Sequence, residues 1–115
     1  MAAVAFALPI LPGQEEVVRR MGEAVSGELR KEYEESRKRL GIIEEKVWVQ
    51  RTPIGQTMIV YWETEDPQRT LREIAESQDE FDSRFRQMIE TAAPAIDLTK
   101  EQPLSNELLF TWQSR

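Results

Sequence analysis

The residues that could carry out chemistry in this chain are tyrosines, arginines and carboxylates, because its 115 residues include neither histidine nor cysteine. Disulfide scaffolds, zinc fingers, thiol nucleophiles, Ser-His-Asp triads and His-ligated haem are therefore excluded within the chain. The glycine patterns of dinucleotide and triphosphate sites are absent as well. The sequence thus predicts no cofactor and no metal site, and any catalysis would depend on a tyrosine hydroxyl, a guanidinium or a carboxylate.

Four residues are candidates for contact with a small ligand: Tyr33, Arg51, Tyr61 and Phe85. They combine an expected position between helices and a sheet with groups that stack on, or hydrogen-bond to, an aromatic or acidic compound. Two ordinary interpretations stay open beside this one. The tyrosines could be core residues that find a hydrogen-bond partner within the protein. Arg51, close to a predicted turn, could be a solvated charge at the rim of the sheet.

Glu45 and Glu63 are predicted to lie opposite each other on neighbouring strands. Two facing carboxylates cost energy unless a cation offsets them, and Arg37 or Arg39 could supply it. Without such a cation, one carboxyl could act as a general base, or the pair could hold a hard cation. The alternative is a solvent-exposed strand end with no function.

The first half of the chain supplies one strand, one helix and a hairpin to position these residues. Alternation of small and bulky side chains predicts a strand over residues 3–10. The helical spacing of apolar residues predicts one long helix over residues 14–40, ended by Gly41. Segments 42–51 and 56–64 are rich in β-branched and aromatic residues, and we expect them to form a hairpin.

The register of this hairpin decides which side chains share a face of the sheet. A three-residue loop over 53–55 would pair Thr52 with Gln56. Tyr61 then faces the helices. The other face of the hairpin carries four residues that we expect to form an interface: Trp48, Met58, Val60 and Trp62.

The second half of the chain begins with helix signals. Asp66 before a proline predicts a helix start, and the Ser-x-x-Glu capping box at Ser77 predicts a second one. We therefore expect one helical region with a kink near Ser77, ended by Pro94. Asp82 and Arg86, four residues apart on this helix, predict an ion pair at the border of the core.

The order of elements predicts the fold class. After a loop over residues 95–106, alternation over 108–113 predicts a last strand. The order is then strand, helix, strand, strand, helix, strand, the α+β ferredoxin-like βαββαβ pattern, in one domain over 1–115. Right-handed crossovers place both helices on one face of the antiparallel sheet. The other face is apolar and uncovered, and its simplest cover is a second copy of the same sheet, which predicts a homodimer.

Three runs of residues carry a resemblance to a known family: Tyr33-x-x-Ser36-Arg37-x-x-Leu40-Gly41-Ile42, Glu45-Lys46-Val47-Trp48-Val49-Gln50 and Phe81-Asp82-x-x-Phe85-Arg86. Together they resemble an uncharacterised domain-of-unknown-function family in the dimeric α/β-barrel superfamily, over almost the whole chain. The resemblance implies two ferredoxin-like protomers packed sheet to sheet, with a small-molecule cavity between each sheet and its helices. Relatives of that architecture include cofactor-free monooxygenases, lactone isomerases, stress-responsive proteins and haem peroxidases. The haem peroxidases do not fit as relatives in function, because this chain has no histidine to ligate a haem iron.

Two functions follow from these expectations. One is a small-ligand-binding protein, such as a cofactor-free monooxygenase or isomerase that acts on a small aromatic or acidic compound. The alternative is a non-catalytic homodimeric assembly or regulatory module. An enclosed pocket with convergent polar groups would favour the first, and a solid core the second.

Charge and hydropathy limit the partners and the compartment. The net charge of −6 argues against nucleic acid and against anionic membrane, since both attract basic surfaces. The apolar start of the chain lacks the charged n-region of a signal peptide, and no other run approaches the ~18 apolar residues of a membrane span. We therefore expect a cytoplasmic protein without nucleic acid or membrane partners, and the lack of cysteine fits that compartment.

Overall fold

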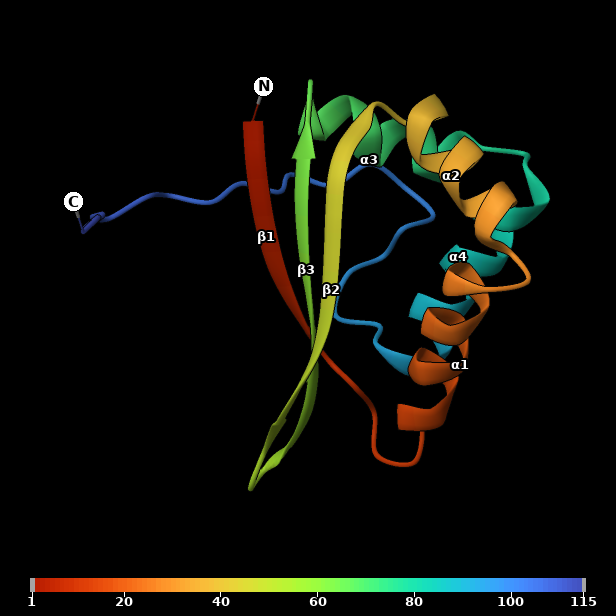
Figure 1. The fold of residues 1–115 in the computed structure, drawn as a ribbon, viewed down its shortest axis with the longest axis horizontal. Helices are drawn as coiled ribbons and strands as arrows, with labels where there is room; N and C mark the ends of the chain where they lie inside the picture. The colour runs from red at the N-terminus through yellow and green to blue at the C-terminus, as the bar shows by residue number, and fades with distance from the viewer. Residues whose placement is uncertain (1, 115) are drawn as a thin grey trace.

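The computed structural model describes residues 2–114, and it has the α+β class that the sequence predicts (Figure 1). The three antiparallel strands are β1 (Ala2–Pro9), β2 (Ile42–Thr52) and β3 (Gly55–Thr64), in the order β1-β3-β2. The helices are α1 (Glu15–Ser26), α2 (Arg30–Arg39), α3 (Pro67–Glu76) and α4 (Glu80–Ala92). They lie on one face of the sheet, and the other face has no helix. None of the helices within residues 2–114 is long and apolar enough to cross a membrane.

The predicted first strand forms, as β1, and its alternation is visible in its burial. Val4 and Leu8 are buried, whereas the alternating alanines are exposed on the other face. Each buried residue of β1 lies opposite a buried residue of β3, Val4 beside Trp62 and Leu8 beside Met58. These four side chains belong to the single core between the sheet and the helices.

The prediction of one long helix over residues 14–40 is wrong, because the chain leaves the helical conformation at Gly27. That residue has φ −133° and ψ −107°, and the helix resumes only at Arg30. The break lets α1 pack Val18 into the core while α2 turns Ser36 and Arg37 inward. Gly41 does follow the second helix, and its φ of +74° is the left-handed conformation expected of a C-terminal glycine.

The predicted hairpin forms, but its predicted register is wrong by one residue. The loop contains two residues rather than three, so Thr52 pairs with Gly55. Trp48 keeps its place on the open face, while every side chain of β3 changes face. The residues expected at the interface from β3 therefore lie in the core, with exposed fractions between 0 and 2%: Met58, Val60 and Trp62. This register buries the larger apolar set of β3 against β1 and the helices.

The predicted kink after the third helix is a full break. Asp66 accepts a hydrogen bond from the backbone N–H of Arg69 as the N-cap of α3, as its position before a proline predicts. Ser77 is extended, with φ −63° and ψ +133°, and Asp79 caps α4 by accepting from two backbone N–H groups. The predicted second helix thus forms, but it begins at Glu80 with Asp79 as its cap rather than at the predicted capping box of Ser77.

The predicted last strand is absent from the structure. Residues 93–114 form neither helix nor strand. Their first part, which includes buried Leu98, packs on the core, and the chain then reaches the outer edge of β1. Beyond Asn106 it leaves the body of the protein (Figure 1). The sheet accordingly has three strands rather than the four of a complete βαββαβ pattern.

Candidate functional site

A buried ion pair between α2 and β2 is the centre of the main polar cluster. Nε of Arg37 lies 2.9 Å from Oε1 of Glu45, and these side chains are only 7% and 4% exposed. The Tyr33 hydroxyl donates to the same oxygen at 2.7 Å. The Trp62 indole N–H donates to Oε2 at 2.6 Å, which is possible because Glu45 and Trp62 are cross-strand neighbours. Three side chains, two from α2 and one from β3, therefore donate to one carboxylate of β2.

The guanidinium of Arg37 is enclosed by aromatic rings as well as by the carboxylate. Its central carbon lies 5.0 Å from the ring centre of Tyr33, 5.6 Å from that of Phe81 and 4.6 Å from that of Phe85. These distances are typical of cation–π contacts. The arrangement holds a desolvated cation between its counterion and three π-faces.

The protonation states in this cluster are fixed around neutral pH. Burial disfavours the charged form of Glu45, but Arg37 and the hydrogen bonds from Tyr33 and Trp62 outweigh it, so the pKa of Glu45 lies below its usual range. Burial and the adjacent Glu45 charge raise the pKa of Tyr33 to about 12. The tyrosine is therefore a protonated donor and the glutamate an ionised acceptor. Neither has a pKa near 7, where a general acid or base works best.

A second carboxylate extends the cluster toward α4. The buried Asp82 accepts from the Ser36 hydroxyl at 2.5 Å, from the Ser77 hydroxyl at 2.6 Å and from Arg39 at 2.8 Å. Arg37 also donates to the Ser36 hydroxyl at 3.0 Å, which joins the two parts. Burial opposes ionisation of Asp82, but the three donors prevail and hold its pKa below the usual range.

The predicted pairing of Asp82 with Arg86 is therefore wrong. Arg86 instead donates to the backbone carbonyl of Ile74 at 2.6 Å, near the end of α3. The prediction that Glu45 and Glu63 are cross-strand neighbours is wrong as well, because the register places Glu44 opposite Glu63. The cation that offsets the charge of Glu45 is Arg37, one of the two arginines that the sequence predicted for this role.

The structure brings together only part of the predicted ligand site. Tyr33 and Phe85 both line the space around Arg37, as described above. Tyr61 was expected to face the helices, but the one-residue change of register places it on the open face. Arg51 is exposed near the tip of the hairpin. The four predicted ligand-site residues thus lie in three separate places and do not line one pocket.

The sequence indicated Arg37 only as a possible counterion of Glu45 and Asp82 only as a partner of Arg86, not as the organising residues of one cluster. A signal for Arg37 was present in the spacing, because it follows Tyr33 by four residues and precedes Leu40 by three on the same helical stripe. A charge on an apolar stripe indicates a buried ion pair. Within residues 2–114, no buried side-chain nitrogen or oxygen lacks a hydrogen-bond partner. The cluster is therefore complete without a ligand and connects α2, α4 and the sheet.

The open face of the sheet is the second notable feature. Trp48 is 51% exposed there and lies opposite Ile59 of β3. Ile59 and Tyr61 are half-buried, and each is paired on its other side with an alanine of β1. The face therefore has a bulky half around β2 and β3 and a flat half along β1.

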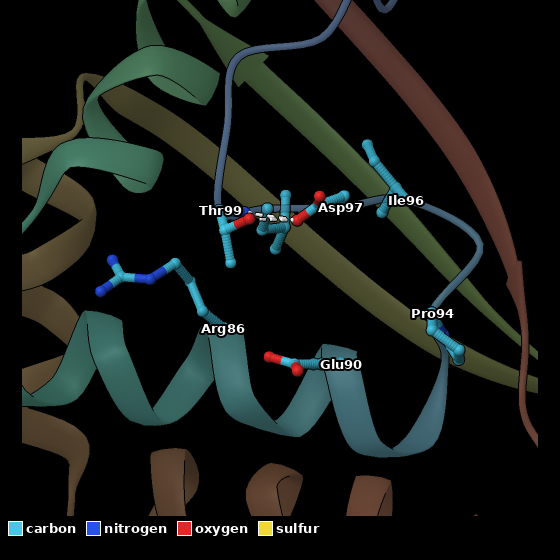
Figure 2. Close-up of a pocket in the computed structure, with 7 residues that line it drawn as sticks. Arg86, Glu90, Pro94, Ile96, Asp97 and Thr99 are labelled. Carbon is cyan, nitrogen blue, oxygen red and sulfur yellow. Dashed lines mark hydrogen bonds between the residues drawn. The ribbon is translucent and has the colours of Figure 1, made fainter.

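A cleft of about 300 Å³ lies between α4 and the segment that follows it (Figure 2). Its lining residues are Arg86, Glu90, Pro94, Ile96, Asp97, Leu98 and Thr99. Figure 2 shows Arg86 extending toward the neighbouring helix, in agreement with its bond to Ile74, while Asp97 is hydrogen-bonded to Thr99. Two carboxylates and one guanidinium give this cleft a net negative charge, which does not suit an acidic compound.

The part of the chain described by the structure contains no group of three or more acidic side chains that could hold a metal ion. The resemblance to the dimeric α/β-barrel superfamily rests on runs that include Arg37, Glu45 and Asp82, and these residues form one connected cluster. Membership of that superfamily stays a prediction. Comparison of the chain with family models, with curated proteins and with solved structures gives no match.

Proposed function

We propose that the protein is a homodimeric assembly module whose interface is the open face of its sheet. The observation that carries this proposal is Trp48, a large aromatic side chain that is 51% exposed on a face without helices. Interface cores are enriched in tryptophan and tyrosine, and both types lie on this face. A second sheet packed at about 10 Å would remove them from water.

The shape of the open face supports a two-fold arrangement. A symmetric dimer places the same patch of both copies in contact. The flat alanine half along β1 of one copy can then receive the bulky half around Trp48 and Tyr61 of the other. Two sheets packed in this way would give the dimeric α/β barrel that the resemblance implies. A ferredoxin-like sheet would need a fourth strand beside β1, and the proposed dimer does not require it.

The interior supports assembly over catalysis. The space where a ligand was expected is occupied by the Arg37–Glu45 cluster, and its polar groups are satisfied by one another. A role as a cofactor-free monooxygenase or isomerase for a small aromatic or acidic compound stays a prediction of the resemblance. Its test is a thermal-shift screen of such compounds, in which a ligand at a hundred times its dissociation constant adds about 2.7 kcal/mol of stability.

Sedimentation equilibrium tests the proposed dimer. We expect twice the 13.4 kDa chain mass at micromolar concentration. Trp48→Glu should shift the protein to monomers, because a carboxylate at the centre of the interface would be buried without a partner. Its matched control is Ile54→Glu at the hairpin tip, where the isoleucine is 99% exposed, and this variant should remain dimeric. A wild-type protein that stays monomeric at high micromolar concentration would refute the proposal.

A further inference from the structure

The exposed large apolar side chains of the chain gather in two places. Within residues 2–114, the C-terminal arm, defined as residues 107–114, carries four of them with exposed fractions of 78 to 86%: Leu108, Leu109, Phe110 and Trp112. Strand β2 carries three more, with exposed fractions of 44 to 52%: Ile43, Val47 and Trp48. The other exposed large apolar residues in this part of the chain are Leu11 and Ile54. Val47, opposite Val60, and Trp48, opposite Ile59, project from opposite faces of β2, so this strand exposes apolar side chains on both of its faces.

The C-terminal arm starts from a fixed point at the edge of the sheet. The side-chain amide of Asn106 donates to the carbonyl of Ala5 and accepts from its N–H, both at 2.8 Å. This amide takes the place of a neighbouring strand on the outer edge of β1. Figure 1 shows the chain then passing β1 and running away from the helices.

Strand β2 forms the opposite edge of the sheet, and its outer side is unpaired. In the order β1-β3-β2, β2 pairs only with β3. Within the described residues, the backbone of residues 43–51 makes no hydrogen bonds beyond those of this pairing. An edge strand with free N–H and C=O groups and exposed apolar side chains is a ready template for another strand.

We infer that the C-terminal arm of one copy docks as an added strand along the free edge of β2 in a second copy. This inference rests on the proposed dimer and specifies its contacts. The alternation of the arm, with Leu108, Phe110 and Trp112 on one side, is the pattern of a strand with a buried face. Eight extended residues span about 26 Å, enough to leave one sheet and lie along another packed about 10 Å away.

The geometry favours exchange between copies over packing within one chain. Asn106 holds the root of the arm at the β1 edge, whereas the receiving strand is at the far edge of the same sheet. The arm also points away from its own sheet (Figure 1). Two-fold symmetry makes the contact reciprocal, so each copy gives one arm and receives one.

The first experiment removes the C-terminal arm by ending the chain after Asn106. The arm is exposed in the single chain, so we expect the circular dichroism spectrum of the truncated protein to retain its shape. We expect its dimer dissociation constant to rise at least tenfold in sedimentation experiments. A second variant keeps the length of the arm and replaces Leu108, Phe110 and Trp112 with serine, and it should show the same loss. The matched control, Ile54→Ser, should leave the dissociation constant unchanged.

The second experiment identifies which copy receives the arm. The chain has no cysteine, so Thr111→Cys on the arm and Lys46→Cys on β2 introduce the only two thiols. Equal amounts of isotopically light and heavy protein are mixed, equilibrated and cross-linked with a short bis-maleimide. We expect linked peptides that combine one light and one heavy partner. The control pairs Thr111→Cys with Glu23→Cys on α1, and this pair should give few links.

The outcomes separate the inference from the proposed dimer. Weaker dimers without the arm, together with mixed-isotope links, support the inference. A truncated protein that dimerises as tightly as the wild type overturns the inference and leaves the proposed dimer standing. Links confined to single chains overturn it as well, because the arm then packs on its own β2. A monomeric wild-type protein overturns both.

Discussion

Glu45 connects α2 and β3 to its own strand β2 through one carboxylate. It is an ionised group in the core that accepts from Arg37, Tyr33 and Trp62. Replacement of such a pair by apolar residues can be neutral, but removal of one partner leaves the other charge buried alone. The stability of the fold therefore depends on keeping the cluster complete.

Glu45→Gln should lower the free energy of unfolding by about 3 kcal/mol, because it leaves the Arg37 guanidinium buried without a counterion. The measurement is urea denaturation followed by circular dichroism. Glu44→Gln is the matched control, since the neighbouring glutamate is exposed on the same strand, and it should change stability by less than about 0.5 kcal/mol. Equal effects of the two variants would show that the buried ion pair contributes nothing.

The same carboxylates predict how stability depends on pH. The folded-state pKa values of Glu45 and Asp82 are depressed, so their contribution is fully present above the unfolded-state values of about 4 and is lost as the pH falls through the folded-state values. With no histidine, the unfolding free energy should stay nearly constant between about pH 6 and 8 and decline below about pH 4. Denaturation curves across this range test the prediction. In Glu45→Gln the acid decline should be shallower, and an identical slope would contradict the assignment.

At the scale of elements, the structure shows which sequence signals were sufficient. The strand of alternating alanines and the hairpin were predictable, because period-2 patterns and turn residues act locally. The hairpin register was not, because loops of two and three residues both fit the sequence around Pro53 and Ile54. The choice between them depends on which side of β3 packs against β1 and the helices, and no local pattern reports that packing.

The other differences between prediction and structure have the same cause. A continuous helical stripe predicted one helix, but the chain breaks at Gly27, where the low helix propensity of glycine lets α1 and α2 make tertiary contacts in different directions. Likewise the alternation of Leu108, Phe110 and Trp112 is genuine, yet a strand needs a neighbour to pair with. In the candidate site, the tyrosine and phenylalanine were identified from type and spacing. The arginine between them was predicted only as one of two possible counterions of Glu45, because burial of a charge depends on a partner from another element.

Replacement by alanine should change the stability of the protein in opposite directions at two glycines, one directly after α2 and one inside α1. Gly41→Ala places a Cβ at a φ of +74° and should cost about 1 kcal/mol. Gly22→Ala lies inside α1, where a Cβ meets nothing within 4 Å, and should stabilise the protein by about 0.5 to 1 kcal/mol. Thermal denaturation of both variants gives the comparison. Stabilisation by both substitutions would show that the left-handed turn after α2 is not required.

At the scale of the whole molecule, the proposed dimer would link folding to association through the uncovered sheet and the exposed arm. One chain alone leaves Trp48 and the apolar residues of the C-terminal arm in water. Burial of this surface against a second copy stabilises the folded state only as far as the second copy is present. The stability of the protein should therefore depend on its concentration, as it does for dimers that unfold to two separate chains.

The melting temperature of the wild-type protein should accordingly rise with concentration, by about 3 to 5 °C for each tenfold increase. This slope follows because a tenfold change in concentration alters the association term by about 1.4 kcal/mol per dimer. Calorimetry from about 1 to about 100 micromolar measures it. Trp48→Glu, which should be monomeric, should melt at one temperature throughout, and the protein truncated after Asn106 should melt lower than the wild type at every concentration within the dimeric range. A wild-type melting temperature that does not change over this range would mean that the open face and the arm contribute no association energy.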